Sequence, residues 1–237
     1  MIVSYNGNIV SFNNSMVDFP VTSTPTLTSN LRLLILGDLN ASTVRTNISS
    51  QLTTLGYSGF TISAITMGTT YSGSGLTPTD YNCVLYYTNS SQIGSTSLPT
   101  NLLNYRNLGG NIITAVFTWN LRPVGWSYSD LTNFVAPVNQ SSDNTNINIL
   151  TEHPIFLGVS SAITNNNSYF VNDIVSIQSG ATTLATFRSN GRPFLATRTI
   201  GSSRLVSVNT FPPGVSTFTN MRRLFTNSVL WAAGITN

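Results

Sequence analysis

The chain has 237 residues, of which 41% are hydrophobic and only 7% are charged. This length and apolar content suffice for one large domain with a substantial core, and they exclude the disordered class, which combines few apolar residues with much charge. The ten basic residues are all arginines and only Arg222 and Arg223 are adjacent, so the clustered basic patch of nucleic-acid-binding proteins is missing and we expect no nucleic-acid partner.

Cysteine and histidine each occur once, as Cys83 and His153. A disulfide within the chain and a cysteine-based zinc site are therefore excluded, and we expect no metal and no cofactor. No apolar run approaches the roughly 20 residues that a membrane-spanning helix needs. The first ten residues lack the basic and apolar regions of a signal peptide, so we expect synthesis without one.

Asn, Ser and Thr supply most of the polar residues. A surface of amides and hydroxyls is suited to packing against other proteins, because few ions have to be desolvated. It is less suited to a free protein in a crowded cytosol, where charge keeps molecules apart. The composition therefore favours a component of an assembly or an extracellular-type protein, although it is also compatible with a merely unusual surface.

The first predicted element is a β-hairpin around Asn6-Gly7, a dipeptide that favours the type I′ turn. A linker with Pro20 and Pro25 follows, so residues 1–30 form an arm and residues 31–237 the main domain. An isolated hairpin is marginally stable, so the arm must dock on its own domain or on a neighbouring chain, and the sequence leaves both open. The arm residues that we expect to make these contacts are Ile2, Val3, Tyr5, Ile9, Val10 and Phe12.

From Leu31 the pattern alternates between strands and helices. The predicted strands are residues 31–37, 60–66, 81–87 and 112–117. The predicted helices are residues 42–55, capped by Ser42 and ended by Gly56, and residues 98–108, with Pro99 in the first turn. This alternation predicts a parallel sheet with right-handed crossovers, in which ligands bind beyond the carboxyl ends of the strands.

The second half is predicted to be mainly β. Residues 120–152 look like a loop, and four β segments follow at 169–177, 183–187, 193–200 and 204–211. The last two flank Gly201 and are predicted to form a hairpin. A final amphipathic helix covers residues 216–233 and ends at Gly234.

Several stretches resemble the class I glutamine amidotransferase-like superfamily, in its divergent ThuA-like branch. They are DYNCVLYYTNSS, NYRNLGGNIITAVF, EHPIFLGV, GRPFLATRTIGSSRLVSVNTFPPG and LFTNSVLWAAG. The resemblance covers roughly residues 31–237. It implies an α/β fold of the flavodoxin-like kind: a three-layer sandwich with a mainly parallel sheet, to which the amino-terminal arm is added.

The resemblance also indicates where catalysis would occur. Glutamine-hydrolysing members of the superfamily carry a cysteine in the tight turn after the strand that matches residues 112–117, with a histidine as base after a later strand. Here the turn reads Thr118-Trp119-Asn120, and Asn209-Thr210-Phe211 replaces the histidine region. The residues for that chemistry are absent, so we expect no catalytic residues and no enzyme activity.

Three other residues have two interpretations each. Asp38 follows the first strand, where it is a functional carboxylate or, as we favour, a cap of the next helix. His153 belongs to the His-Pro-Ile motif, which favours a structural turn over ligand contact. Cys83 lies inside a strand, where a thiol is usually inert. The residues that could line a ligand crevice are Asp38, Ser90, Thr118, Trp119, Asn120 and His153.

We therefore expect a non-enzymatic structural subunit of a larger assembly, such as a virion or a similar protein shell. Its partners would be other protein subunits, and its arm would add strands to the sheet edge of a neighbouring chain. The location would be a virion or an extracellular-type assembly, with the cytoplasm as the alternative. The alternative function is a carbohydrate- or small-ligand-binding module that uses the crevice.

Overall fold

A computed structural model gives the fold of the chain. It describes residues 2–5, 8–11, 27–28, 30–89, 95–119, 130–135, 140–143, 146–160, 169–172, 176–215 and 218–235. In the strands at 2–5, 8–11, 27–28, 140–143 and 169–172, only the backbone is described.

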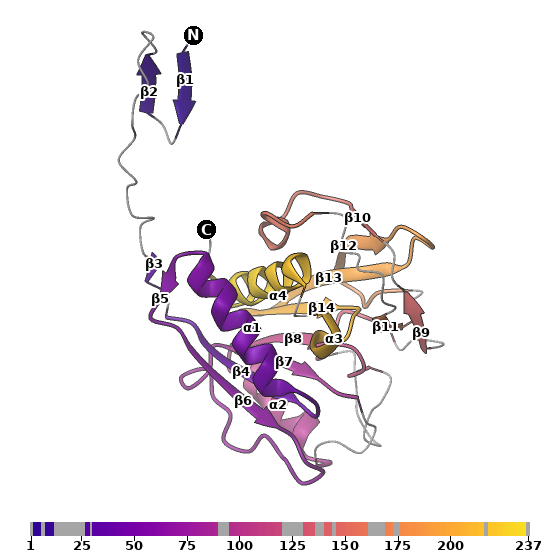
Figure 1. The fold of residues 1–237 in the computed structure, drawn as a ribbon. Helices are drawn as coiled ribbons and strands as arrows, with labels where there is room; N and C mark the ends of the chain where they lie inside the picture. The colour runs from indigo at the N-terminus through magenta and orange to yellow at the C-terminus, as the bar shows by residue number, and fades with distance from the viewer. Residues whose placement is uncertain are drawn as a thin grey trace.

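One eight-stranded sheet organises the domain (Figure 1). In sheet order its strands are β10 (Ile147–Ile149), β12 (Thr182–Phe187), β13 (Pro193–Ile200), β14 (Ser203–Val208), β8 (Asn111–Ala115), β7 (Cys83–Tyr87), β4 (Arg32–Gly37) and β6 (Thr61–Thr66). The strands from β14 to β6 run parallel, whereas β13, β12 and β10 add antiparallel pairs. The predicted α/β class with a mainly parallel sheet is confirmed.

Helices cover both faces of this sheet, which makes the three layers of the predicted sandwich. The helices are α1 (Ala41–Thr54), α2 (Leu98–Asn107), the short α3 (Pro212–Val215) and α4 (Thr219–Ala232), with a 3₁₀ turn η1 (Pro154–Phe156). The buried residues of α1 and α4 belong to one hydrophobic cluster, and those of α2 belong to another. Among the described residues, no helix has the length and apolar character needed to cross a bilayer.

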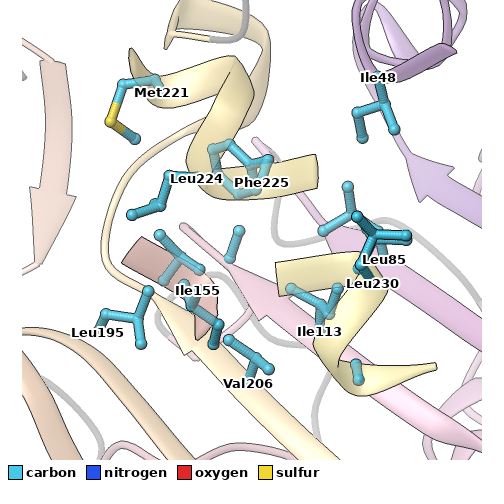
Figure 2. Packing of buried hydrophobic residues seen from close by; sticks show 14 of the residues in the cluster. Ile48, Leu85, Ile113, Ile155, Leu195, Val206, Met221, Leu224, Phe225 and Leu230 are labelled. Atoms are coloured by element: carbon cyan, nitrogen blue, oxygen red, sulfur yellow. The ribbon is translucent and has the colours of Figure 1, made fainter. Parts of the chain in front are cut away.

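The two clusters follow the alternation of side chains along the strands. In β4, Leu33 and Ile35 pack with α1 and α4, whereas Leu34 and Leu36 pack on the α2 side. Figure 2 shows the first cluster, where Leu224 and Phe225 of α4 lie close to residues of the sheet. Each fully buried side chain of this size contributes about 1.5–3 kcal/mol, so the two faces together supply the main stabilisation of the fold.

Helix ends agree with the sequence prediction in most places. Gly56 and Gly234 follow α1 and α4 with positive φ, and Pro99 lies in the first turn of α2, as predicted. The start of α1 is different. The residue before its first turn is Asn40, in the left-handed conformation with φ of 53°, so Ser42 lies inside the helix and does not cap it.

Two strands in the predicted loop at residues 120–152, and a small sheet that one of them forms, differ from the sequence prediction. Residues 120–152 contain β9 (Gln140–Asp143) and β10, and the segment predicted as one strand at 169–177 contains β11 (Tyr169–Asn172), which pairs with β9 and not with the main sheet. The reason is composition. A wholly polar strand such as QSSD lacks the apolar alternation that identifies strands in a sequence.

The arm contains the predicted hairpin. Strands β1 (Ile2–Tyr5) and β2 (Asn8–Ser11) pair antiparallel with Tyr5 opposite Asn8, and they form a two-stranded sheet of their own, drawn apart from the main sheet in Figure 1. Phe12 lies outside the described residues. The linker is not wholly irregular, because β3 (Leu27–Thr28) pairs parallel with β5 (Tyr57–Ser58). The boundary at residue 30 stays a prediction.

Candidate functional site

The carboxyl ends of four neighbouring parallel strands meet at one edge of the sheet. β4 ends at Gly37, β7 at Tyr87, β8 at Ala115 and β14 at Val208. The residues that follow them are the natural place for a ligand in an open α/β sheet. Asp38 follows β4, Thr88 follows β7, and Thr118 lies in the turn after β8.

Asp38 links the ends of β4 and β7. One carboxylate oxygen accepts a hydrogen bond from the Asn89 backbone N–H at 2.7 Å and one from the Thr88 hydroxyl at 3.3 Å. The residue at the amino-terminal cap position of α1 is Asn40, two residues further along the chain. The favoured prediction that Asp38 caps this helix is therefore wrong. The chain bends at Asn40, and the Asp38 side chain contacts the neighbouring strand.

Tyr87 fills the space beside Asp38. Its hydroxyl donates to the Leu39 carbonyl at 2.9 Å, and its ring lies so close to Gly37 that a Cβ at this position would clash with it. Burial raises the pKa of Tyr87 above its ordinary range, and the nearby Asp38 carboxylate raises it further. Tyr87 therefore stays a neutral phenol and fixes the turn after β4.

The turn after β8 is packed into the core. The strand ends at Ala115, the Val116–Phe117 peptide bond is cis, and the Thr118 hydroxyl donates to the Ala115 carbonyl at 2.8 Å. Thr118 is 3% exposed and Trp119 only 1%. The Trp119 ring meets Phe134 edge to face, with centroids 5.0 Å apart.

These contacts correct the predicted crevice. Trp119 was expected to offer its ring to a ligand, but it is a core residue in the cluster that α2 covers. The strand β8 ends at Ala115, two residues earlier than predicted. In the turn that follows, the Thr118 hydroxyl bonds the Ala115 carbonyl and the Trp119 ring packs on Phe134, so both side chains are directed into the core. Ser90 and Asn120 lie outside the described residues.

His153 lies at the other end of the sheet. Its Nδ1 accepts a hydrogen bond from the Ile155 N–H at 3.3 Å and so caps η1. Its ring packs on Trp231, with centroids 5.1 Å apart, and the Arg204 guanidinium lies over the same indole ring. The Arg204 backbone N–H donates to the side-chain oxygen of Asn111, the first residue of β8.

The structure therefore separates His153 from Asp38, since Asn111 and Arg204 lie near the amino ends of their strands. Burial lowers the pKa of His153, and the Arg204 charge lowers it further. The imidazole is neutral near pH 7 and serves as a helix cap, in agreement with the favoured interpretation of the His-Pro-Ile motif as a structural turn.

Cys83 has no exposed surface, and burial raises the pKa of its thiol far above the ordinary range. It therefore has the inert character expected of a thiol inside a strand. Within the described part of the chain, no group of three or more His, Cys, Asp or Glu residues could hold a metal ion.

Sequence reasoning missed two residues of this edge. Asn89 is exposed and supplies the backbone N–H that holds Asp38, and Tyr87 closes the space above Gly37. The role of Tyr87 could be predicted from the pairing of a glycine with a tyrosine on adjacent strands, because Gly37 lies opposite Tyr87. This pairing can be recognised only when the register between β4 and β7 is known.

Comparison with known proteins identifies the fold. A cytoplasmic protein from Salmonella typhimurium is 11% identical, with a TM-score of 0.62 over 85% of this chain and 99% of that one. A protein described as ThuA-like from Bacteroides uniformis is 12% identical, with a TM-score of 0.58 over 91% of this chain and 95% of that one. Another from Parabacteroides merdae is 16% identical, with a TM-score of 0.54 over 90% of this chain and 92% of that one. The fold is that of ThuA-like proteins.

This ThuA-like fold also occurs inside longer chains. A β-galactosidase from Rahnella sp. R3 matches 84% of this chain with a TM-score of 0.52 and 11% identity, and the match covers 30% of the enzyme. At these identities the likeness concerns the fold alone. No protein-family model and no curated protein matches the sequence.

Proposed function

We propose that the chain is a non-enzymatic structural subunit of a larger protein assembly. The observation that carries this proposal is the turn after β8. Where an amidotransferase would keep its nucleophile, Thr118 and Trp119 are buried, and the Thr118 hydroxyl is used within the turn. A hydroxyl held in this way cannot reach a substrate without opening the core.

The missing base supports the same proposal. The chain has a single histidine, and its Nδ1 accepts a backbone N–H at the opposite end of the sheet from Asp38. A nucleophile needs a base within hydrogen-bond reach. Asp38 itself binds Thr88 and Asn89, so its carboxylate links two strand ends.

The surface chemistry favours association with other proteins. Only 7% of the residues are charged, and among the described residues a single ion pair forms, between Arg106 and Asp130 at 3.8 Å. Burying such a surface in an interface desolvates few ions. A virion or a similar protein shell is the setting that we propose, because such subunits bury large areas permanently.

The hairpin arm supplies a means of association. The β1–β2 hairpin has two outer edges with which other strands can pair, and strand addition gives main-chain hydrogen bonds between subunits. We propose that this arm pairs with a neighbouring chain.

The test breaks the hairpin in the full-length chain. Val3 lies opposite Val10 in the hairpin, so the double variant Val3→Pro/Val10→Pro removes backbone donors from both strands. Light scattering after size-exclusion chromatography should show a large loss of assembled mass, while circular dichroism of the domain stays unchanged. Normal assembly of the double variant would overturn the role of the arm.

Ligand binding is the alternative function, and melting-temperature and activity measurements test it. A monomeric chain whose melting temperature rises with an added oligosaccharide, and no longer rises in Asp38→Asn, would replace the assembly proposal. Glutaminase or esterase turnover that is lost in Asp38→Asn would make the protein an enzyme.

A further inference from the structure

Strand β6 forms one border of the eight-stranded sheet. It pairs with β4 over six residues, from Thr61 opposite Arg32 to Thr66 opposite Gly37, without a register shift. In the part of the chain that the structure describes, no strand pairs with its other side. Figure 1 shows β6 at the outer border of the domain.

The hydrogen-bonding direction of β6 follows from its two ends. Thr61 donates its N–H to the Leu31 carbonyl at 2.8 Å, and Met67 donates to the Gly37 carbonyl at 2.9 Å. Alternate residues of a strand direct both backbone groups to the same side. The N–H and C=O groups of Ile62, Ala64 and Thr66 therefore point away from β4, and no described residue is hydrogen-bonded to them.

This edge lacks the devices that normally protect a sheet border. Natural edge strands carry charges, prolines or bulges, or they are very short. β6 has none of these, and no charged residue or histidine occurs from Thr46 to Thr79. The opposite border differs, because β10 has only three residues and Arg188 binds the side chain of Asn148 there.

We propose that β6 is a dimer interface, on which β6 of a second copy pairs antiparallel around a two-fold axis at Ala64. In this register Ala64 lies opposite its own counterpart, and Ile62 lies opposite Thr66 of the other copy. The outward groups then form about six hydrogen bonds between the copies.

Two properties of the edge favour a second copy as the occupant. A two-fold interface places like residues near each other, and charged edges would repel, whereas this uncharged edge does not. The residue at the axis is an alanine, whose small side chain lets the two backbones approach. Burial is also compatible, because Ile62 and Ala64 pack on the cluster under α1 and leave only part of their surface exposed.

The inference deepens the proposed assembly role but does not depend on the arm. A two-fold contact at β6 closes on itself and gives a dimer. A second and different contact through the hairpin would link such dimers into a larger structure.

Disulfide formation tests the register. Cα atoms of opposite residues in an antiparallel hydrogen-bonded pair are about 5.5 Å apart, within the range that a disulfide spans. The native Cys83 is fully buried, so an introduced thiol is the reactive one. Under mild oxidation, Ala64→Cys should form covalent dimers at least tenfold faster than Thr182→Cys, an exposed strand position in β12. Equal rates, or monomers only, would overturn the proposal.

A charge placed on the edge tests the same interface without cysteine. Thr66 is exposed, so Thr66→Lys should keep the fold and raise the dimer dissociation constant at least tenfold in sedimentation equilibrium. Thr182→Lys, which introduces the same charge on exposed β12, should leave it unchanged. An unchanged constant in Thr66→Lys would contradict the proposal.

The arm variant separates this inference from the proposed function. If Val3→Pro/Val10→Pro loses the large assembly while the Ala64→Cys cross-link still forms in that background, both proposals hold. If the arm variant loses the assembly and Ala64→Cys never cross-links, the edge inference is wrong and the arm proposal stands. A cross-linked dimer with an assembly insensitive to the arm supports only the edge.

Discussion

Trp119 lies in the turn after β8, where the sequence predicts a residue that could contact a ligand. Its ring instead packs on Phe134 in the cluster beneath α2. The indole N–H has no hydrogen-bond partner among the described residues, and an unpaired buried donor reduces stability. The residue therefore acts through its volume.

Its substitution separates packing from ligand contact. Trp119→Ala should lower the free energy of unfolding by about 3–5 kcal/mol, because a large buried side chain leaves a cavity. Chemical denaturation measures this change. Asn89→Ala, an exposed residue at the same edge of the sheet, should change stability by less than about 0.5 kcal/mol. A Trp119→Ala variant as stable as the parent would contradict the packing role of this ring.

His153 gives the protein a pH-dependent stability. The folded-state pKa lies below the ordinary value of 6.5, because burial and then Arg204 disfavour the imidazolium. The unfolded chain therefore binds this proton more readily, and stability should be complete above about pH 6.5 and fall as the pH decreases below it. Thermal unfolding between pH 7.5 and 5 measures the effect.

His153→Asn is the matched control for this prediction. Asn is a favoured cap and accepts the same backbone N–H without titrating, so it should keep η1 and lose part of the slope below pH 6.5. The same slope in both proteins would show that other groups cause it.

At the scale of elements, two side chains of α4 hold the η1 turn. Asn227 is buried, and its side-chain N–H₂ donates to the Ile155 carbonyl at 3.0 Å and to the Leu157 carbonyl at 2.9 Å. Arg223 on the same helix donates to the Leu157 carbonyl as well. These bonds fix the His-Pro-Ile segment on the α1 and α4 face of the sheet.

Removing this amide should loosen the segment. Asn227→Leu keeps the approximate volume but takes both donors away, and we expect a loss of about 1–3 kcal/mol in the free energy of unfolding. Asn104→Leu, at an exposed position of helix α2, controls for the change in residue type. Equal stability of the two variants would contradict the assigned role of Asn227.

Elements with strong patterns could be predicted from the sequence. The apolar run Leu33–Leu36 and the stripe of α4 identify buried elements whatever surrounds them, and Gly201 marks the β13–β14 hairpin. The strand Gln140–Asp143 could not be found, because its polar residues show no alternation. Its pairing with β11 depends on a contact between distant segments, which local patterns do not encode.

The candidate site was less predictable than the fold. The sequence identifies which residues follow the strands, and Asp38 does lie beside the end of β7. Local sequence patterns do not give the last residue of a strand or the direction in which the following turn points its side chains. For these reasons the burial of Trp119 and the separation of His153 from Asp38 were not predicted. The placement of Asn89 likewise depends on the register between β4 and β7.

At the scale of the whole molecule, an α/β domain with the fold of ThuA-like proteins is combined with a charge-poor composition, an open sheet edge and a hairpin arm. In the arm, β3 pairs with β5 of the domain, and the β1–β2 hairpin forms a separate two-stranded sheet. Within the described residues, we propose the edge of β6 and the hairpin as the places where main-chain groups pair with other chains.

The most direct test is the mass of the unmodified full-length chain in solution. Sedimentation velocity over a hundredfold range of concentration should show species heavier than the 25.6 kDa of one chain, with a mass that grows with concentration. A single species of 25.6 kDa at every concentration would contradict the assembly role.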